Sequence, residues 1–263
     1  MLTEVKKEFK LTLLSVKYNI MREMANPLSF VLNVLFMMVN NATFLVQWAI
    51  LFTLKDSFGI YGFKEVCLLW GLSAASYGLA HILFHGAFTL SEDIENGSLD
   101  QYLILPRDTL ICSITSSTSI SAIGDFLYGI ILSIIFYHSI SDIILIILFT
   151  ILGGLIFTSF GIIYSSFAFL FTKTSDFSYS IFNMFITFSL YPETVFNKVI
   201  RIIFYTLIPV AFAVYLPVGV ILNFNILNIL LITLFTIFIM LMSYYIFYNG
   251  LKKYTSSNLS ISR

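Results

Sequence analysis

Long uncharged apolar runs, separated by short polar segments, dominate the pattern of this chain. About 20 apolar residues carry a helix across the hydrocarbon layer of a bilayer, where a helix satisfies its own backbone polar groups. The pattern therefore predicts an all-α integral membrane protein with six transmembrane helices. The predicted spans cover about residues 27–54, 64–90, 109–138, 143–171, 177–191 and 226–249, within a transmembrane domain at 27–249.

The apolar run ahead of the last span is predicted to enter the membrane without crossing it. Basic residues flank the first and the last span, which predicts that both tails, including 250–263, are cytoplasmic and that the number of crossings is even. Seven apolar pieces are present, so one of them does not cross. The piece at 202–216 has Pro209 at its centre and Pro217 behind it. We therefore predict an outer re-entrant hairpin at 192–222, buried by protein.

The first 26 residues show the period of an amphipathic helix. The apolar positions are Val5, Phe9, Leu13, Val16, Ile20 and Met24, and the opposite face holds Lys6, Lys7, Lys10 and Lys17. We predict that residues 1–26 form an interfacial helix on the inner membrane surface, with the lysines toward anionic headgroups. Packing on a soluble partner is the alternative. Charges along the whole segment argue against a cleavable signal.

Composition agrees with this class and excludes others. Hydrophobic residues make up 59% of the chain, charged residues 11%, and the mean hydropathy is +0.94. A net charge of zero without a basic stripe argues against a nucleic-acid partner. The predicted topology puts Cys67 and Cys112 on opposite sides of the membrane, which predicts free thiols and no metal site. The sequence has no G-x-x-x-x-G-K-[ST] phosphate loop, so we expect neither an ATP site nor an enzyme.

The most polar stretch, TLSEDIENGSLDQYLILPRD at 89–108, contains the predicted cytoplasmic connection 91–108 between spans two and three. It holds five carboxylates against one cation, Arg107. Thr89 and Glu92 have the spacing of a capping box that opens a helix, and Asn96 with Gly97 is a helix stop. Ser98 and Gln101 have the same spacing for a second helix, which places Leu99, Tyr102 and Leu103 on one side and ends before Pro106. The pattern predicts a compact pair of short helices.

Three motifs in this chain resemble the permease subunits of ABC-2-type transporters, in the branch called ABC-2 family transporter proteins. The first is an acid-x-x-x-G-x-L-x-x-x-L-x-x-P pattern, matched by Asp93, Gly97, Leu99, Leu103 and Pro106. The second pairs LYPETVF at 190–196 with LIPVAFAVYLP at 207–217, and the third is GLKKYTSSN at 250–258. Thr255 and Ser257 depart from the acidic and small residues that relatives often have there.

The resemblance implies a membrane-spanning half of an ATP-driven exporter. Segment 91–108 would then be a coupling segment that docks on a separate ABC ATPase, and residues 1–26 an elbow helix. Its implied ATPase-interface residues are Glu92, Asp93, Glu95, Asn96, Gly97, Ser98, Leu99, Asp100, Leu103 and Pro106. The chain itself would bind no cofactor, because ATP and Mg²⁺ belong to the partner ATPase. A second permease, the same or a related chain, would complete a complex in the plasma membrane, most simply a bacterial one.

A few polar residues within the spans are candidates for the translocation path. Asp125 lies midway along the third predicted span, where a carboxylate costs about 2.5–3.5 kcal/mol, so it should face the bundle interior. It either lines the path or bonds structurally to another helix. His81 and His85 share a helix face, and we expect hydrogen bonds across helices in preference to a metal site. Breaks near the membrane suggest an outer gate, or else an ordinary loop, at Tyr191, Pro192, Glu193, Pro209 and Pro217.

Close helix packing is predicted where small residues recur four positions apart. These pairs are Gly71 with Ala75, Ala74 with Gly78, and Gly154 with Thr158. Two other functions are considered. A membrane-integral enzyme lacks a convergent set of catalytic residues. A channel or an ATPase-independent secondary transporter is the main alternative, although the chain shows no internal repeat. The pattern does not choose among drug, lipid, peptide and glycan substrates.

Overall fold

The computed structural model describes residues 2–171 and 173–255, and this part of the chain is helical, with a single isolated β-bridge between Phe58 and Tyr61. Four helices in it are long and apolar enough to cross a membrane. The helices are α1 (Leu2–Glu23), α2 (Pro27–Leu54), α3 (Phe63–Phe84), α4 (Gly86–Glu95), α5 (Asp100–Leu103), α6 (Thr109–Ile114), α7 (Ser121–Phe136), α8 (Ile140–Ser165), η1 (Ser166–Phe169), α9 (Ser175–Ser189), η2 (Glu193–Val195), α10 (Lys198–Thr206), η3 (Ala211–Tyr215), α11 (Leu216–Leu222) and α12 (Ile226–Leu251).

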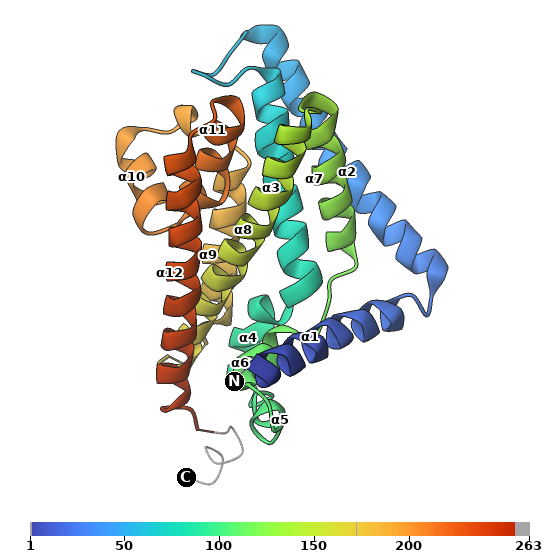
Figure 1. Ribbon diagram of the computed structural model, residues 1–263, viewed down its shortest axis with the longest axis vertical. Coiled ribbons are helices and arrows are strands. Elements are labelled where there is room, and N and C mark those ends of the chain that lie inside the picture. The colour runs from blue at the N-terminus through green and yellow to red at the C-terminus, as the bar shows by residue number, and fades with distance from the viewer. Residues whose placement is uncertain (1, 172, 256–263) are drawn as a thin grey trace.

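The long helices lie side by side and alternate in direction (Figure 1). The α2–α3 and α7–α8 connections lie at one end of the bundle, near α10 and α11. The opposite end carries α4, α5 and α6, together with the beginning of α1 and the end of α12. The four membrane-capable helices are α2, α3, α8 continued by η1, and α12, and the bent pair around η3 would be a fifth if it is one span. Because α7 and α9 have 16 and 15 residues, the count of six crossings stays a prediction.

Helix α3 forms the centre of the core. Every residue from Val66 to Ser76 is buried, and the helix packs mainly against α7 and α8. The small residues allow this packing: a Cβ added at Gly129 of α7 would collide with backbone atoms of Gly71 and Ala75, and one at Gly78 would lie 2.5 Å from the amide nitrogen of Phe126. The prediction of close packing along this face of α3 is therefore confirmed.

The predicted third span at 109–138 is wrong as a continuous helix, because the chain breaks between α6 and α7. The break is the hydroxyl-rich run from Thr115 to Ser119. Hydroxyl side chains compete with helical hydrogen bonding, and here the groups bond to α3 instead. The Thr118 hydroxyl donates to the carbonyl of Ile82 at 2.9 Å, and the Ser119 amide to that of His81 at 3.1 Å.

The start of the polar connection also differs from the prediction. Helix α3 ends at Phe84, and after a break at His85 a separate helix, α4, continues to Glu95. Thr89 therefore lies inside α4, so the predicted capping box with Glu92 is wrong. His85 itself keeps helical dihedral angles, φ −56° and ψ −34°. The apolar pattern of residues 64–90 cannot distinguish this arrangement from one continuous helix.

Helix α1 lies along the end of the bundle that carries α4 to α6 (Figure 1). The Ser15 hydroxyl and the Asn19 amide both donate to the Thr115 carbonyl, at 2.8 and 3.1 Å, and an ion pair of 3.1 Å joins Arg107 to Glu8. Its lysines 7, 10 and 17 are exposed, and Val16 is buried. The side chains of residues 2–6 and 9 lie outside the description. Its interfacial position stays a prediction.

The proline-rich segment ahead of α12 is bent. Helix α10 and the stretch from Ala211 to Leu222 meet at 83°. Pro209 and Pro217 are both buried there, and because a proline lacks an N–H donor, the turn before Pro217 is the π-helix η3. The Tyr215 hydroxyl donates to the carbonyls of Phe188 and Tyr191, at 2.6 and 3.1 Å, and fixes this segment to the end of α9. Whether the segment re-enters or crosses a membrane stays a prediction.

Candidate functional site

The acidic connection begins with the helix stop expected at Asn96 and Gly97. Helix α4 ends at Glu95, Asn96 follows as its C-cap, and Gly97 has a φ of +75°. Glycine adopts this left-handed conformation without the steric penalty of a Cβ. The Leu99 amide then donates to the Asp93 carbonyl at 3.1 Å, which closes the turn. The predicted stop is confirmed.

The second short helix has a different start from the one predicted. Helix α5 covers Asp100–Leu103 and is preceded by Leu99, with no side-chain cap, so the Ser98–Gln101 capping box is wrong. Leu99 is completely buried in a small apolar cluster with Leu90 and Ile94. Burial of Leu99 positions the turn and leaves Ser98 exposed. Tertiary packing therefore fixes this helix in place of a local cap.

An exposed apolar surface begins at the last residue of α5 and continues directly after the helix. We call it the apolar tip and define it as residues 103–105. Leu103, Ile104 and Leu105 are 42%, 83% and 43% exposed, and Pro106 after them is exposed as well. Figure 1 shows α5 protruding from the end of the bundle. The implied interface residues omitted Ile104 and Leu105. The signal in the sequence was an unbroken LIL run inside its most polar segment.

The Glu95 carboxylate joins the end of α4 to the beginning of α9, a contact that we call the Glu95 clasp. Its Oε1 accepts hydrogen bonds from the Thr174 amide, from the Thr174 hydroxyl at 3.1 Å and from the Ser175 amide at 3.2 Å. Burial alone would raise the pKa of Glu95, but these donors outweigh it and hold the pKa below its ordinary value of 4.5. The carboxylate therefore caps α9 from another helix.

The other implied interface residues differ in exposure. Glu92, Asn96 and Ser98 are exposed, and Asp93 and Asp100 are partly buried. Burial, assisted by the charge of Glu92, raises the pKa of Asp93. The acidic residues of the connection are thus exposed or partly buried, and the apolar tip in the same connection is exposed.

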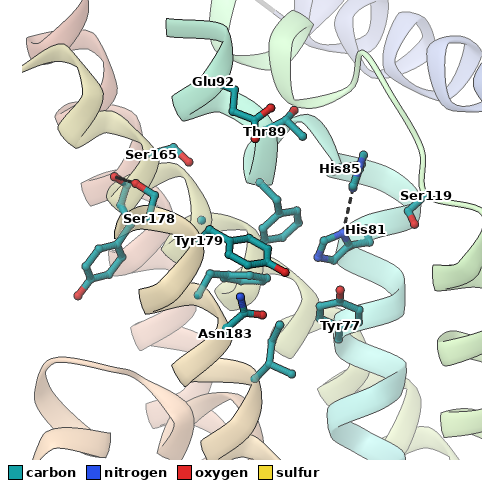
Figure 2. A pocket seen from close by; sticks show the side chains of 15 residues that line it. Tyr77, His81, His85, Thr89, Glu92, Ser119, Ser165, Ser178, Tyr179 and Asn183 are labelled. Carbon is teal, nitrogen blue, oxygen red and sulfur yellow. Dashed lines mark hydrogen bonds between the residues drawn. The ribbon is translucent and has the colours of Figure 1, made fainter. Parts of the chain in front are cut away.

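Three cavities follow one another along the bundle, each lined by α3 and by residues of α9 or directly after it, and α2 also lines the second and the third. The first, of about 290 Å³, lies nearest α4 and is lined by Tyr77, His81, His85 and Glu92, among others. Figure 2 shows Tyr77 and His81 on one wall of it and Ser178 and Asn183 on the other. The second holds about 240 Å³ and shares Tyr77, Asn183 and Ile186 with the first. The third is small, about 30 Å³, and shares Phe44, Trp70 and Leu190 with the second.

Asp125 lines the second cavity. It is 3% exposed, and its Oδ1 accepts a hydrogen bond of 2.6 Å from the Asn41 side chain of α2. The residue therefore faces the bundle interior, as predicted. Asp125 bonds to another helix, as one of the two interpretations predicted, and it also lines a cavity; its place in a translocation path stays a prediction.

The predicted outer-gate residues separate into two groups. Tyr191 lines the third cavity and its ring contacts Trp48 with centroids 5.9 Å apart. Pro192 is buried, and the Glu193 carbonyl accepts from the Arg201 guanidinium at 2.9 Å. Pro209 and Pro217 line none of the three cavities and instead break the helices around η3. The structure does not bring this set together at one opening.

The two histidines bond to each other. A hydrogen bond of 3.0 Å joins their Nδ1 atoms, and the His81 ring stacks on Phe88 with centroids 3.9 Å apart (Figure 2). We expected each histidine to bond to another helix, and this expectation is wrong. His81 and His85 lie one helical turn apart and bond to each other. Within the described residues no three His, Cys, Asp or Glu side chains form a possible metal site, and Cys67 and Cys112 are free and buried.

Four helices that are long and apolar enough to cross a membrane are typical of a multi-pass membrane protein. A family model described as ABC-2 family transporter protein matches residues 38–258. The chain therefore belongs to the ABC-2 transporter family and is a permease component of an ABC-type transporter. Searches of curated proteins and of solved structures found no match.

Proposed function

We propose that this chain is the membrane-spanning permease half of an ATP-driven ABC-2-type exporter. It has six spans, α2, α3, α6 with α7, α8 with η1, α9 and α12, with an outer re-entrant segment around η3 and cytoplasmic chain ends in a plasma membrane. Helices of alternating direction, with the beginning of α1 and the end of α12 on the same side as α4 to α6, support this topology (Figure 1). ATP and Mg²⁺ bind to a separate ABC ATPase, the kind of partner with which this family generally works.

The apolar tip is the observation that carries this proposal. Residues 103–105 are exposed at the end of the bundle where α1 begins and α12 ends, in a connection that also carries exposed or partly buried acidic residues. An exposed apolar surface with a polar rim is typical of a protein contact. The tip docks into a groove of the ATPase, and the Glu95 clasp transmits the movement of the connection to α9.

The three cavities form part of the translocation path, which a second permease completes. Helix α2 borders the second and third cavities and exposes an apolar face beside them. That face includes Leu28, Leu35, Phe36, Val39, Val46 and Ile50. An apolar face next to a cavity that holds a carboxylate suits a partner permease, the same or a related chain, together with the lipid around it.

The central test is replacement of Ile104 by aspartate. A charge at the apolar tip should prevent docking, because the carboxylate would have to be buried in the interface. We expect that the tagged chain, purified from its host in mild detergent, retains at least about tenfold less of a co-purifying ATPase with a phosphate loop. Quantitative mass spectrometry measures the ratio of the two subunits.

Ile60→Asp is the matched control, because Ile60 is 68% exposed at the opposite end of the bundle. This variant should retain the wild-type amount of ATPase. Equal retention by all three proteins would contradict docking through the tip. Ionic conductance of the purified chain in a planar bilayer, without any ATPase, would instead support the alternative of a channel or an ATPase-independent secondary transporter.

The sidedness of the connection can be tested by cysteine labelling. Ser98 is exposed, and both native cysteines are buried, so Ser98→Cys introduces a single accessible thiol. A membrane-impermeant maleimide should label it only after the cells are opened, whereas Ile60→Cys should be labelled in intact cells. Labelling of Ser98→Cys from outside would overturn the proposed topology.

A further inference from the structure

Asp125 has an oxygen atom that the protein does not satisfy. Asn41 donates one amide hydrogen to Asp125 Oδ1 at 2.6 Å and the other to the Met37 carbonyl at 3.1 Å, so both of its donors are used. The second carboxylate oxygen, Oδ2, is buried without a hydrogen-bond partner. Leaving a buried acceptor unpaired is unfavourable by about 1–3 kcal/mol, and more for a charged group. This oxygen therefore favours a bound donor.

Two donors in the second cavity are already used within the protein. The Trp70 indole N–H donates to the Leu190 carbonyl at 3.0 Å, and the Ser73 hydroxyl pairs with that of Ser189 at 2.6 Å. These bonds join α3 to α9 and hold the cavity walls together. A donor for Asp125 from outside the chain would not have to break either of them.

The charges along the three cavities have one sign. Asp125 lines the second cavity and Glu92 the first, and no Lys or Arg is among the described residues that line any of the three. Phe44 and Trp70 line the same cavity as Asp125, and their ring centroids are 5.2 Å apart. A carboxylate and aromatic faces that line one cavity both attract cations, and low-dielectric walls strengthen this attraction.

We propose that the second cavity is a binding site for a protonated amine, so that the substrate of this permease is an amphiphilic organic cation. The ammonium group pairs with the Asp125 carboxylate, and the apolar part of the molecule lies against Phe44 and Trp70. Phosphate or carboxylate groups would be repelled by the two carboxylates along the cavities, so anionic lipids and acidic glycans do not fit. This inference rests on the proposed function for the statement that the bound amine is exported.

A matched pair of ligands tests the site on the purified full-length chain without an ATPase. Naphthylmethylamine carries the ammonium group, and naphthylmethanol is its neutral counterpart of nearly the same shape. Equilibrium dialysis in detergent should show that Asp125→Asn weakens amine binding by at least about tenfold and leaves alcohol binding unchanged. Asparagine keeps an oxygen that can accept from Asn41, so the helix contact is retained.

Two further variants keep the test decisive. Asp56→Asn, which changes an exposed carboxylate between α2 and α3, should bind both ligands like the wild type. Should Asp125→Asn fail to fold, Phe44→Leu should weaken the amine and the alcohol alike, because the naphthyl group of either ligand lies against Phe44, and Phe44 is 40% exposed, so its replacement leaves the core intact. Equal binding of amine by the wild type and by the folded variants would overturn the proposal. Because ATPase co-purification is measured separately, that outcome would leave the exporter assignment standing.

Discussion

Replacing Glu95 by alanine should uncouple ATP hydrolysis from transport, because the beginning of α9 would lose its hydrogen bonds to the end of α4. The clasp supplies three hydrogen bonds from Thr174 and Ser175 to one carboxylate oxygen. Removal of a helix cap costs about 0.5–2 kcal/mol of local stability. In the purified complex we expect transport per ATP hydrolysed to fall by at least about fivefold, a typical magnitude for coupling between distant sites. Proteoliposomes with a substrate of the complex give both rates.

Two variants separate the clasp from the general acidity of the connection. Glu92→Ala removes an exposed carboxylate from the same helix and should have a much smaller effect on coupling. Thr174→Ala removes only the hydroxyl donor and keeps both amide donors, so its effect should lie between those of Glu92→Ala and Glu95→Ala. Equal losses in Glu92→Ala and Glu95→Ala would show that negative charge matters and the clasp does not.

The clasp also has a defined dependence on pH. Because the pKa of Glu95 is lower in the folded chain than its ordinary value of 4.5, the unfolded chain binds more protons near that pH. The stabilisation is therefore complete above pH 4.5 and is lost as the pH falls through the lowered pKa. The difference in melting temperature between the wild type and Glu95→Gln should shrink on going from pH 7 to pH 4.

Substituting Gly129 by alanine should be the most destabilising single methyl addition between α3 and α7. The new Cβ would overlap backbone atoms of Gly71 and Ala75, which cannot move as a flexible side chain can. Overpacking of this kind typically costs about 1–3 kcal/mol. In a chain of this size each kcal/mol lowers the melting temperature by roughly 2–4 °C. Thermal unfolding of the detergent-purified protein measures the change.

Gly219 provides the control for this experiment. It also lies in a helix, α11, but no heavy atom is within 4 Å of a Cβ added there. Gly219→Ala should therefore melt at the wild-type temperature or slightly above it, since alanine has the higher helix propensity. Equal melting temperatures for the two variants would mean that the α3–α7 contact is looser than the structure indicates.

The residues that misled the sequence interpretation share one property: their partners are distant in the chain. The run from Thr115 to Ser119 is compatible with a helix, and it breaks because α1 and α3 supply partners for its polar groups. Ser98 has the spacing of a cap, but burial of Leu99 sets the start of α5. Gly97 was predictable because a helix stop is a local matter of backbone conformation.

The candidate site shows the same division. Local pattern singled out Asp125 as a carboxylate that must face the interior, but its pairing with Asn41, the unpaired Oδ2 and the neighbouring aromatic rings depend on how α2, α3 and α7 pack. The Glu95 clasp joins residues 79 and 80 positions apart, and no spacing rule connects them.

The sequence by itself determined that this chain is a helical membrane protein, because apolar runs of span length have no other stable state than helices in a bilayer. Its motifs also indicated the ABC-2 family, which the match over residues 38–258 confirms. Only the tertiary structure decided which polar groups meet, where cavities remain, and which apolar side chains stay exposed on α5. These features arise from packing between distant segments, and local periodicity carries no information about them.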